Sequence, residues 1–134
     1  MDKFVLDDRL AADTLPLADW ALSRVLLMND ARYPWLILVP RRAGLVELHD
    51  LGHAERMVLS EEIVRASKAL KAHTGGAKIN IGALGNVVAQ LHIHVVARSP
   101  GDAAWPGPVW GHGAREPYAP DVLERTLSKL AAIC

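Results

Sequence analysis

The stretch Gln90-Leu91-His92-Ile93-His94-Val95-Val96 decides the fold of this chain, because polar and apolar residues alternate along it with a period of two. Such alternation is typical of a β-strand, in which successive side chains point to opposite faces. The polar members, which share one face, are Gln90, His92 and His94. The pattern therefore predicts a strand from about residue 87 to 98, with one chemical face and one core face.

Two histidines on one face of a strand form a candidate functional site. Two residues of roughly 3.3 Å rise each place them about 7 Å apart along the backbone, so both rings can reach one small anionic group or one metal ion. A neutral imidazole is also a competent nucleophile, and at phosphorus it forms a phosphohistidine. The residues alone favour a chemical role over a solubilising surface.

The remaining elements surround this strand on both sides. Apolar runs predict strands over residues 23–28, 35–39 and 78–81 and an extended segment over 14–20. Residues 23–28 and 35–39, joined by a short turn, form a predicted antiparallel hairpin. Helical spacing predicts helices over about 5–13 and 52–73, and an apolar stripe predicts a C-terminal helix that contains Leu123, Leu127 and Leu130.

Composition limits the classes of function. The 134 residues suit one domain, and 51% hydrophobic with 22% charged residues suits a globular protein. Fifteen basic and fifteen acidic residues give zero net charge, so no overall field attracts nucleic acid or an anionic membrane. The one cysteine, Cys134, excludes an intramolecular disulfide. The N-terminus has no long apolar region, so we expect a cytoplasmic protein.

The histidine stretch resembles the second half of the histidine triad signature, in which three histidines alternate with apolar residues. Gln90 stands at the position of the first histidine. Upstream, residues 80–82 (Asn-Ile-Gly) and 85–86 (Gly-Asn) are similar to the approach to that triad, and downstream Arg98 and residues 105–107 (Trp-Pro-Gly) are similar to the tail of the nucleoside phosphoramidate hydrolase branch. The resemblance runs from about residue 25 to 107.

This resemblance implies an α+β fold with an antiparallel sheet of about four to five strands, a long helix, a C-terminal helix and a homodimer that pairs the central sheets. It also implies that His92 attacks the α-phosphate of a purine nucleotide conjugate and that His94 lies near the phosphate oxygens, without a required metal or cofactor. Gln90 is expected to hold the nucleophile. The expected substrate-binding residues are Asn80, Asn86, Leu27, Asn29, Arg98 and Trp105.

The chain departs from the family pattern at three positions. Gln90 cannot titrate, which removes any proton relay through the first histidine, although its amide can donate and accept hydrogen bonds. Val87 stands where many members have Ser or Thr, and Trp35 where several have a histidine. The nucleophile is thus kept while its surroundings differ.

Three functions follow as alternatives. The first is a nucleotide hydrolase or nucleotidyl transferase acting on a dinucleoside polyphosphate or a nucleoside phosphoramidate. The second is a nucleotide-binding or regulatory module on the same scaffold, with weak or no catalysis. The third is a metal site built on His92 and His94 with His112 or an aspartate, which ranks last because two histidines without a sure third ligand are a weak signal.

Overall fold

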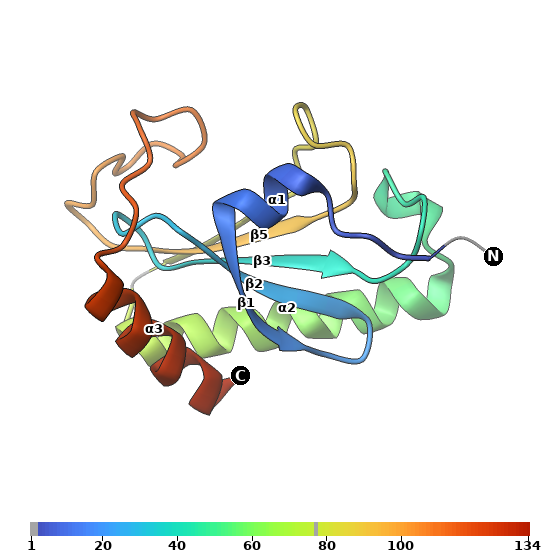
Figure 1. The fold of residues 1–134 in the computed structure, drawn as a ribbon, viewed down its shortest axis with the longest axis horizontal. Coiled ribbons are helices and arrows are strands. Elements are labelled where there is room, and N and C mark those ends of the chain that lie inside the picture. Colours follow the sequence, from blue (N-terminus) through green and yellow to red (C-terminus); the bar gives the residue numbers. More distant parts are fainter. Residues whose placement is uncertain (1–2, 77) are drawn as a thin grey trace.

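The computed structural model describes residues 3–76 and 78–134 (Figure 1). The described elements follow the chain as α1 (Asp8–Asp13), β1 (Thr14–Asp19), β2 (Ser23–Met28), β3 (Trp35–Pro40), a 3-10 turn (Leu48–Asp50), α2 (His53–Thr74), β4 (Lys78–Gly82), β5 (Ile93–Arg98) and α3 (Pro120–Ile133). The strands form one five-stranded antiparallel sheet in the order β1-β2-β3-β5-β4. The predicted α+β class, long helix and C-terminal helix are confirmed.

The histidine strand is shorter than its sequence pattern predicts, because β5 begins at Ile93 and not near residue 87. A strand needs hydrogen-bonded neighbours, and these exist only from Ile93 onward: Leu38 pairs with Ile93, and Gly82 pairs with His94. Before that point the neighbours diverge, and the backbone N–H of Leu91 donates to the carbonyl of Leu45 in a loop. The prediction of a strand over 87–92 was therefore wrong.

The opening helix is also shorter than predicted. It begins at Asp8, where the side chain of Asp7 accepts a hydrogen bond of 2.8 Å from the backbone N–H of Arg9. Such a side-chain acceptor satisfies a helical N–H that has no partner within the helix. Residues 5–7 consequently run as an extended segment in front of α1.

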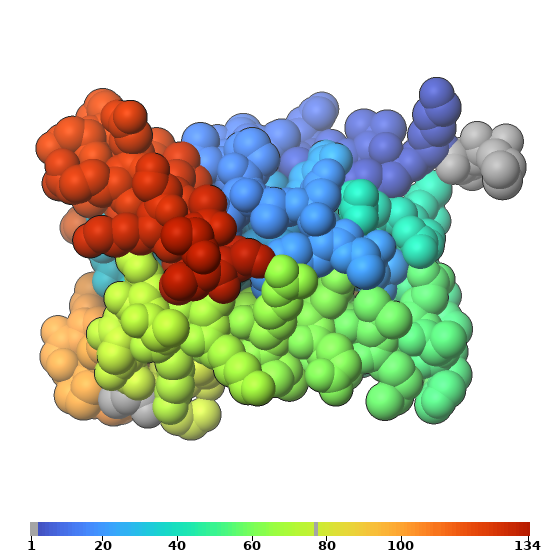
Figure 2. Space-filling model, turned by 90° about the horizontal axis from the view of Figure 1, so that it is seen from below, coloured from blue at the N-terminus to red at the C-terminus, as the bar shows by residue number. Residues whose placement is uncertain are grey.

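Helices α2 and α3 cover one face of the sheet, and α1 lies on the other (Figure 1). Seen from below, α2 runs across the whole width of this face with α3 beside one end of it (Figure 2). The apolar stripe of α2, which includes Leu59, Ala66 and Leu70, is buried against Leu36 and Val95 of the sheet. Burying each large aliphatic side chain contributes about 1.5–3 kcal/mol, so this layer is the main source of stability.

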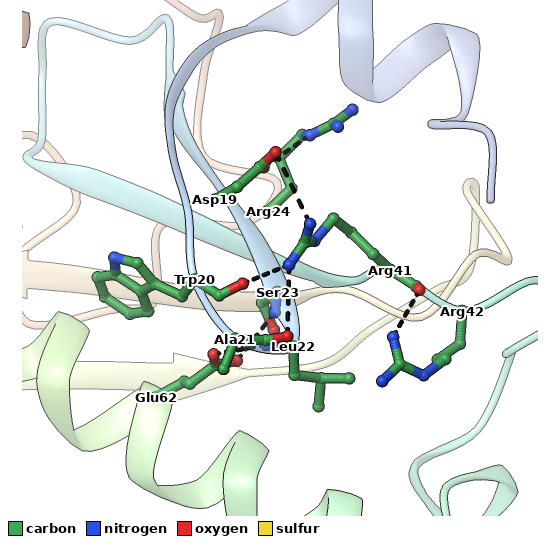
Figure 3. A network of polar contacts seen from close by, with 9 residues as sticks. All are labelled: Asp19, Trp20, Ala21, Leu22, Ser23, Arg24, Arg41, Arg42 and Glu62. Atoms are coloured by element: carbon green, nitrogen blue, oxygen red, sulfur yellow. Dashed lines mark hydrogen bonds and ion pairs between the residues drawn. The ribbon is translucent and has the colours of Figure 1, made fainter.

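Two features fix the position of α2. At its C-terminal end, Gly75 adopts a left-handed backbone (φ 63°), which ends the helix at small steric cost. Nearer its start, the buried carboxylate of Glu62 accepts hydrogen bonds of 3.0 Å from the backbone N–H groups of Leu22 and Ser23 (Figure 3). This carboxylate ties the turn between β1 and β2 to the helix.

The same turn is held from its other side by Arg41, which follows β3 (Figure 3). Its guanidinium donates to the carbonyl of Trp20 and lies 3.8 Å from the carboxylate of Asp19. The guanidinium of Arg65 on α2 lies 4.2 Å from the centre of the Trp20 ring. These arginine contacts are therefore structural.

Within the described part of the chain, no helix combines the length and apolar character that a membrane span requires.

Candidate active site

The centre of the candidate site is the pair His92 and His94, whose rings lie edge to face with centroids 4.9 Å apart. Their side chains are only 6% and 8% exposed. Leu91, Ile93 and Val95 point into the opposite cluster, which packs against α2. The predicted division into a histidine face and a core face holds for these five residues, although only Ile93, His94 and Val95 lie in β5, where strand geometry alternates side chains.

His92 is held by the backbone just before it. Its Nδ1 lies 2.7 Å from the carbonyl oxygen of Gln90. A carbonyl only accepts hydrogen bonds, so Nδ1 carries the proton and donates it. In the neutral form of the ring, this hydrogen bond places the lone pair on Nε2, where it can attack phosphorus.

His94 is held in the opposite tautomer by Trp35, the first residue of β3. The indole Nε1–H of Trp35 donates to Nδ1 of His94 over 3.0 Å. An indole N–H is only a donor, so Nδ1 accepts and the proton lies on Nε2. Burial, with a smaller effect of nearby His92, lowers the pKa of His94 to about 3. His94 is thus a neutral hydrogen-bond donor at physiological pH.

Trp110, from the loop after β5, covers His94 from another side. The Trp110 and His94 ring centroids lie 5.6 Å apart, and those of Trp110 and Trp35 lie 6.4 Å apart. The indole also packs closely on Gly82, where an added Cβ would lie 3.0 Å from a ring carbon. A larger residue at position 82 would therefore displace Trp110 and open the cover over His94.

Two cavities adjoin His92. The first, of about 210 Å³, also contacts His94 and is largely apolar; its remaining lining is Arg9, Leu10, Asp13, Thr14, Met28, Ile37, Gly85, Val87 and Val88. The second, of about 190 Å³, is more polar; besides His92 its lining is Val46, Glu47, Leu48, Ala83, Leu84, Gly85, Ala89, Gln90 and Leu91. A group bound in each cavity would have His92 between them, as a transfer reaction requires.

The side chain of Gln90 contacts the N-terminal segment and not the histidine pair. Its Oε1 accepts from the backbone N–H of Asp7, and its Nε2 donates to the carbonyl of Val5, each over 2.8 Å. Gln90 lies before β5, so its side chain does not share a strand face with His92 and His94 as the alternating pattern predicts. Gln90 holds His92 through its backbone carbonyl, whereas its amide fixes residues 5–7.

Three of the residues expected to bind substrate form a separate cluster. Arg98, only 1% exposed, donates to Asp102 over 2.8 and 2.9 Å and to Oδ1 of Asn80 over 2.9 Å. Its guanidinium also lies 5.7 Å from the Trp105 ring. The hydrogen bonds from Arg98 hold the pKa of Asp102 below its usual range. None of these residues lines either cavity, and the polar groups of Arg98 are already bonded within the cluster.

The other expected contacts lie in different places. Leu27 is fully buried in the cluster beneath α2, so its neighbour Met28 reaches the apolar cavity instead. Asn29 accepts from the backbone N–H of Tyr118 over 2.9 Å and does not line a cavity. Asn86 is exposed in the loop whose neighbouring residues line both cavities.

Sequence reasoning did not identify several residues that the fold brings to the site. Arg9 and Leu10 arrive from α1, Ile37 from β3 and Val88 from the loop before β5. In the sequence, Leu10, Ile37 and Val88 have the same apolar pattern as any core residue, and Arg9 looks like any exposed arginine. Only their arrangement around His92 distinguishes them.

A metal site is not supported by the geometry. Across residues 3–76 and 78–134, no three His, Cys, Asp or Glu side chains come close enough together to hold a metal ion. His112 is exposed, and its carbonyl accepts from Arg32 over 2.7 Å.

With the fold and the histidine pair defined, comparison with known proteins places the chain. The family model for the HIT domain matches residues 12–101, and the chain belongs to the HIT, or histidine triad, family. A histidine triad protein of Sinorhizobium meliloti is 45% identical (TM-score 0.95, 98% of this chain and 97% of that chain). Those of Bradyrhizobium japonicum (46%, TM-score 0.95, 98% of both chains) and Marinobacter aquaeolei (43%, TM-score 0.96, 98% and 96%) are equally similar. A search of the curated proteins gave no match.

Proposed function

We propose that this HIT-family protein is a nucleotide hydrolase or nucleotidyl transferase that reacts through Nε2 of His92. The observation that carries this proposal is the hydrogen bond from His92 Nδ1 to the Gln90 carbonyl, which in the neutral ring places the lone pair on Nε2. Beside it, His94 offers the complementary Nε2–H. A lone pair next to a fixed donor is the arrangement that in-line attack on a phosphate ester or amide requires.

The reaction then proceeds in two steps. The Nε2 lone pair of His92 forms a bond to the α-phosphorus while the bond from phosphorus to the leaving oxygen or nitrogen breaks. The Nε2–H of His94 donates a hydrogen bond to a phosphoryl oxygen, where negative charge develops. The leaving group takes up a proton from solvent. Water then attacks the same phosphorus as the bond between phosphorus and Nε2 breaks; the water returns a proton to solvent, the nucleoside monophosphate is released and His92 is restored. Suitable substrates are dinucleoside polyphosphates and nucleoside phosphoramidates.

The two cavities supply places for the two parts of such a substrate. The apolar side chains of Leu10, Met28 and Ile37 suit a purine base, so we place the nucleoside in the first cavity. The leaving group then occupies the more polar cavity on the other side of His92. In this arrangement Met28 replaces Leu27 as the nucleoside contact, and Gln90 occupies the place of the first histidine of the triad.

A second candidate function is nucleotide binding or regulation without turnover. It is favoured by the Gln90 amide, which is bonded to the N-terminal segment and offers no titratable group for proton transfer. Under either function we propose that the 134 residues act as one cytoplasmic domain. We further propose a homodimer, because the edge strand β4, the loop that follows it and helix α2 expose Ile81, Leu84, Met57 and Val58.

Intact mass measurement separates the two functions. The protein is mixed with an adenosine phosphoramidate or a diadenosine polyphosphate, with His92→Asn as the matched variant. Turnover through His92 produces an adenylyl adduct or AMP with the wild-type protein and neither with the variant, which still binds nucleotide. Unchanged turnover by His92→Asn would refute the covalent route. Binding without any consumption would support the regulatory function.

A further inference from the structure

The histidine pair carries no fixed positive charge. The Nδ1 of His94 accepts the hydrogen bond of Trp35, and burial opposes protonation of the ring. His92 can act as a nucleophile only with Nε2 unprotonated. The α-phosphate of a nucleotide is an anion, and an anion in a partly enclosed cavity needs compensating charge. That charge has to come from another side chain.

Arg9 is the side chain placed to supply it. Apart from the histidines, it is the one basic residue in the lining of either cavity within the described chain. It lies in the first turn of α1 and is exposed, and no salt bridge joins it to another residue that the structure describes. An arginine with no carboxylate partner beside a histidine pair is available to an incoming anion.

The acidic residues of the two cavities agree with this placement. Asp13 shares the first cavity with Arg9, but its carboxylate lies 3.5 Å from the guanidinium of Arg115, which offsets its charge. The second cavity contains Glu47 and no Lys or Arg. Of the two cavities, the first is therefore the one that suits the α-phosphate.

Hydrogen bonds of Gln90 connect the backbone segment that carries Arg9 with His92. Gln90 clamps Val5 and Asp7, and the carboxylate of Asp7 accepts from the N–H of Arg9 over 2.8 Å. The carbonyl of the same Gln90 holds His92. One residue therefore connects the segment that carries Arg9 with the residue that attacks phosphorus.

We propose that Arg9 is the phosphate-binding cation of this site, brought to the apolar cavity by α1 and positioned by the amide of Gln90. The proposal rests on the proposed function, since it assumes that the site binds a nucleotide. It assigns nucleotide recognition to a residue outside the histidine stretch and its flanking loops. In this proposal the side chain of Gln90 serves to hold the segment that carries Arg9.

The test compares the binding of AMP and adenosine by calorimetry, with GMP and guanosine as a second pair. The variants are Arg9→Ala and Arg9→Lys, with Arg125→Ala as the control, because Arg125 is an exposed arginine on α3. The loss of one hydrogen bond to a charged group raises the dissociation constant by roughly tenfold. We expect Arg9→Ala to bind AMP about tenfold more weakly and adenosine as the wild type does. Arg9→Lys should retain most of the AMP affinity, and Arg125→Ala all of it.

Each contrary outcome is distinct. If Arg9→Ala binds AMP as tightly as the wild-type protein does, the assignment of Arg9 is overturned. The proposed function is not refuted by that result, because the wild-type protein still binds AMP. An equal loss for AMP and adenosine would show that Arg9 shapes the cavity and does not bind phosphate, which also overturns it. A wild-type protein that binds no nucleotide or nucleoside would refute the proposed function itself. Gln90→Ala should weaken AMP binding in the same direction, because it releases the segment that carries Arg9.

Discussion

Replacing Trp35 by Phe tests whether the tautomer of His94 matters for activity. The substitution keeps an aromatic ring but removes the N–H that donates to His94 Nδ1 over 3.0 Å. Both side chains are buried, 5% and 8% exposed, so water does not readily replace the lost partner. An unsatisfied buried acceptor costs about 1–3 kcal/mol. If this cost is expressed in the transition state, turnover falls by about 5- to 150-fold.

The assay measures the release of AMP from an adenosine phosphoramidate, together with nitrogen NMR of the histidine rings. We expect slower turnover and a mixture of His94 tautomers in the Trp35→Phe protein. The matched control is Trp20→Phe. Trp20 is equally buried and lies in the cluster under α2, but its indole N–H has no hydrogen-bond partner among the residues that the structure describes.

Trp20→Phe should lower the free energy of unfolding and leave turnover unchanged. The reasoning about His94 would be refuted if Trp35→Phe kept wild-type turnover and a single Nε2–H tautomer. The NMR measurement decides the structural point even if the protein proves to be a binding module without turnover.

Three further predictions concern other hydrogen-bonded groups. Gln90→Ala should speed hydrogen exchange at the Asp7 amide and cost about 1–3 kcal/mol of stability, because the two hydrogen bonds from the Gln90 side chain to the N-terminal segment are lost. Unchanged exchange would contradict this. His94 has a pKa of about 3 when folded and near 6.5 when unfolded, so its contribution to stability is complete above about pH 6.5 and is lost as the pH falls toward 3. Urea titrations should show a slope of the unfolding free energy against pH that is smaller in His94→Gln by at most about 1.4 kcal/mol per pH unit; an equal slope in both would contradict the assignment. Glu62→Gln should destabilise the fold by about 1–3 kcal/mol, since an amide oxygen replaces only one of the two acceptors, whereas the exposed Glu61→Gln on the same helix should have little effect; equal unfolding midpoints would refute the role of Glu62.

Sequence patterns predicted the helices and strands well where the deciding interactions are local. The strand over Ser23–Met28 and the stripe of α2 with Leu59, Ala66 and Leu70 follow from periodicity, because a strand or helix repeats its side chains at a fixed interval. The strand over residues 87–92 was predicted by the same pattern and is absent. Alternation describes the chain itself, whereas a strand also needs a neighbour to bond, and Gly82 is where that neighbour turns away.

The sequence by itself determined that the chain presents His92 and His94 on one face and aliphatic residues on the other, since alternation is a property of adjacent residues. Only the tertiary structure decided how those histidines are held. Their opposite tautomers come from the Gln90 carbonyl and from Trp35, which is 59 residues from His94. The amide of Gln90 bonds Asp7, 83 residues away, and that contact brings Arg9 to the cavity. Such partners are chosen by the packing of distant segments, and no local pattern in the sequence encodes them.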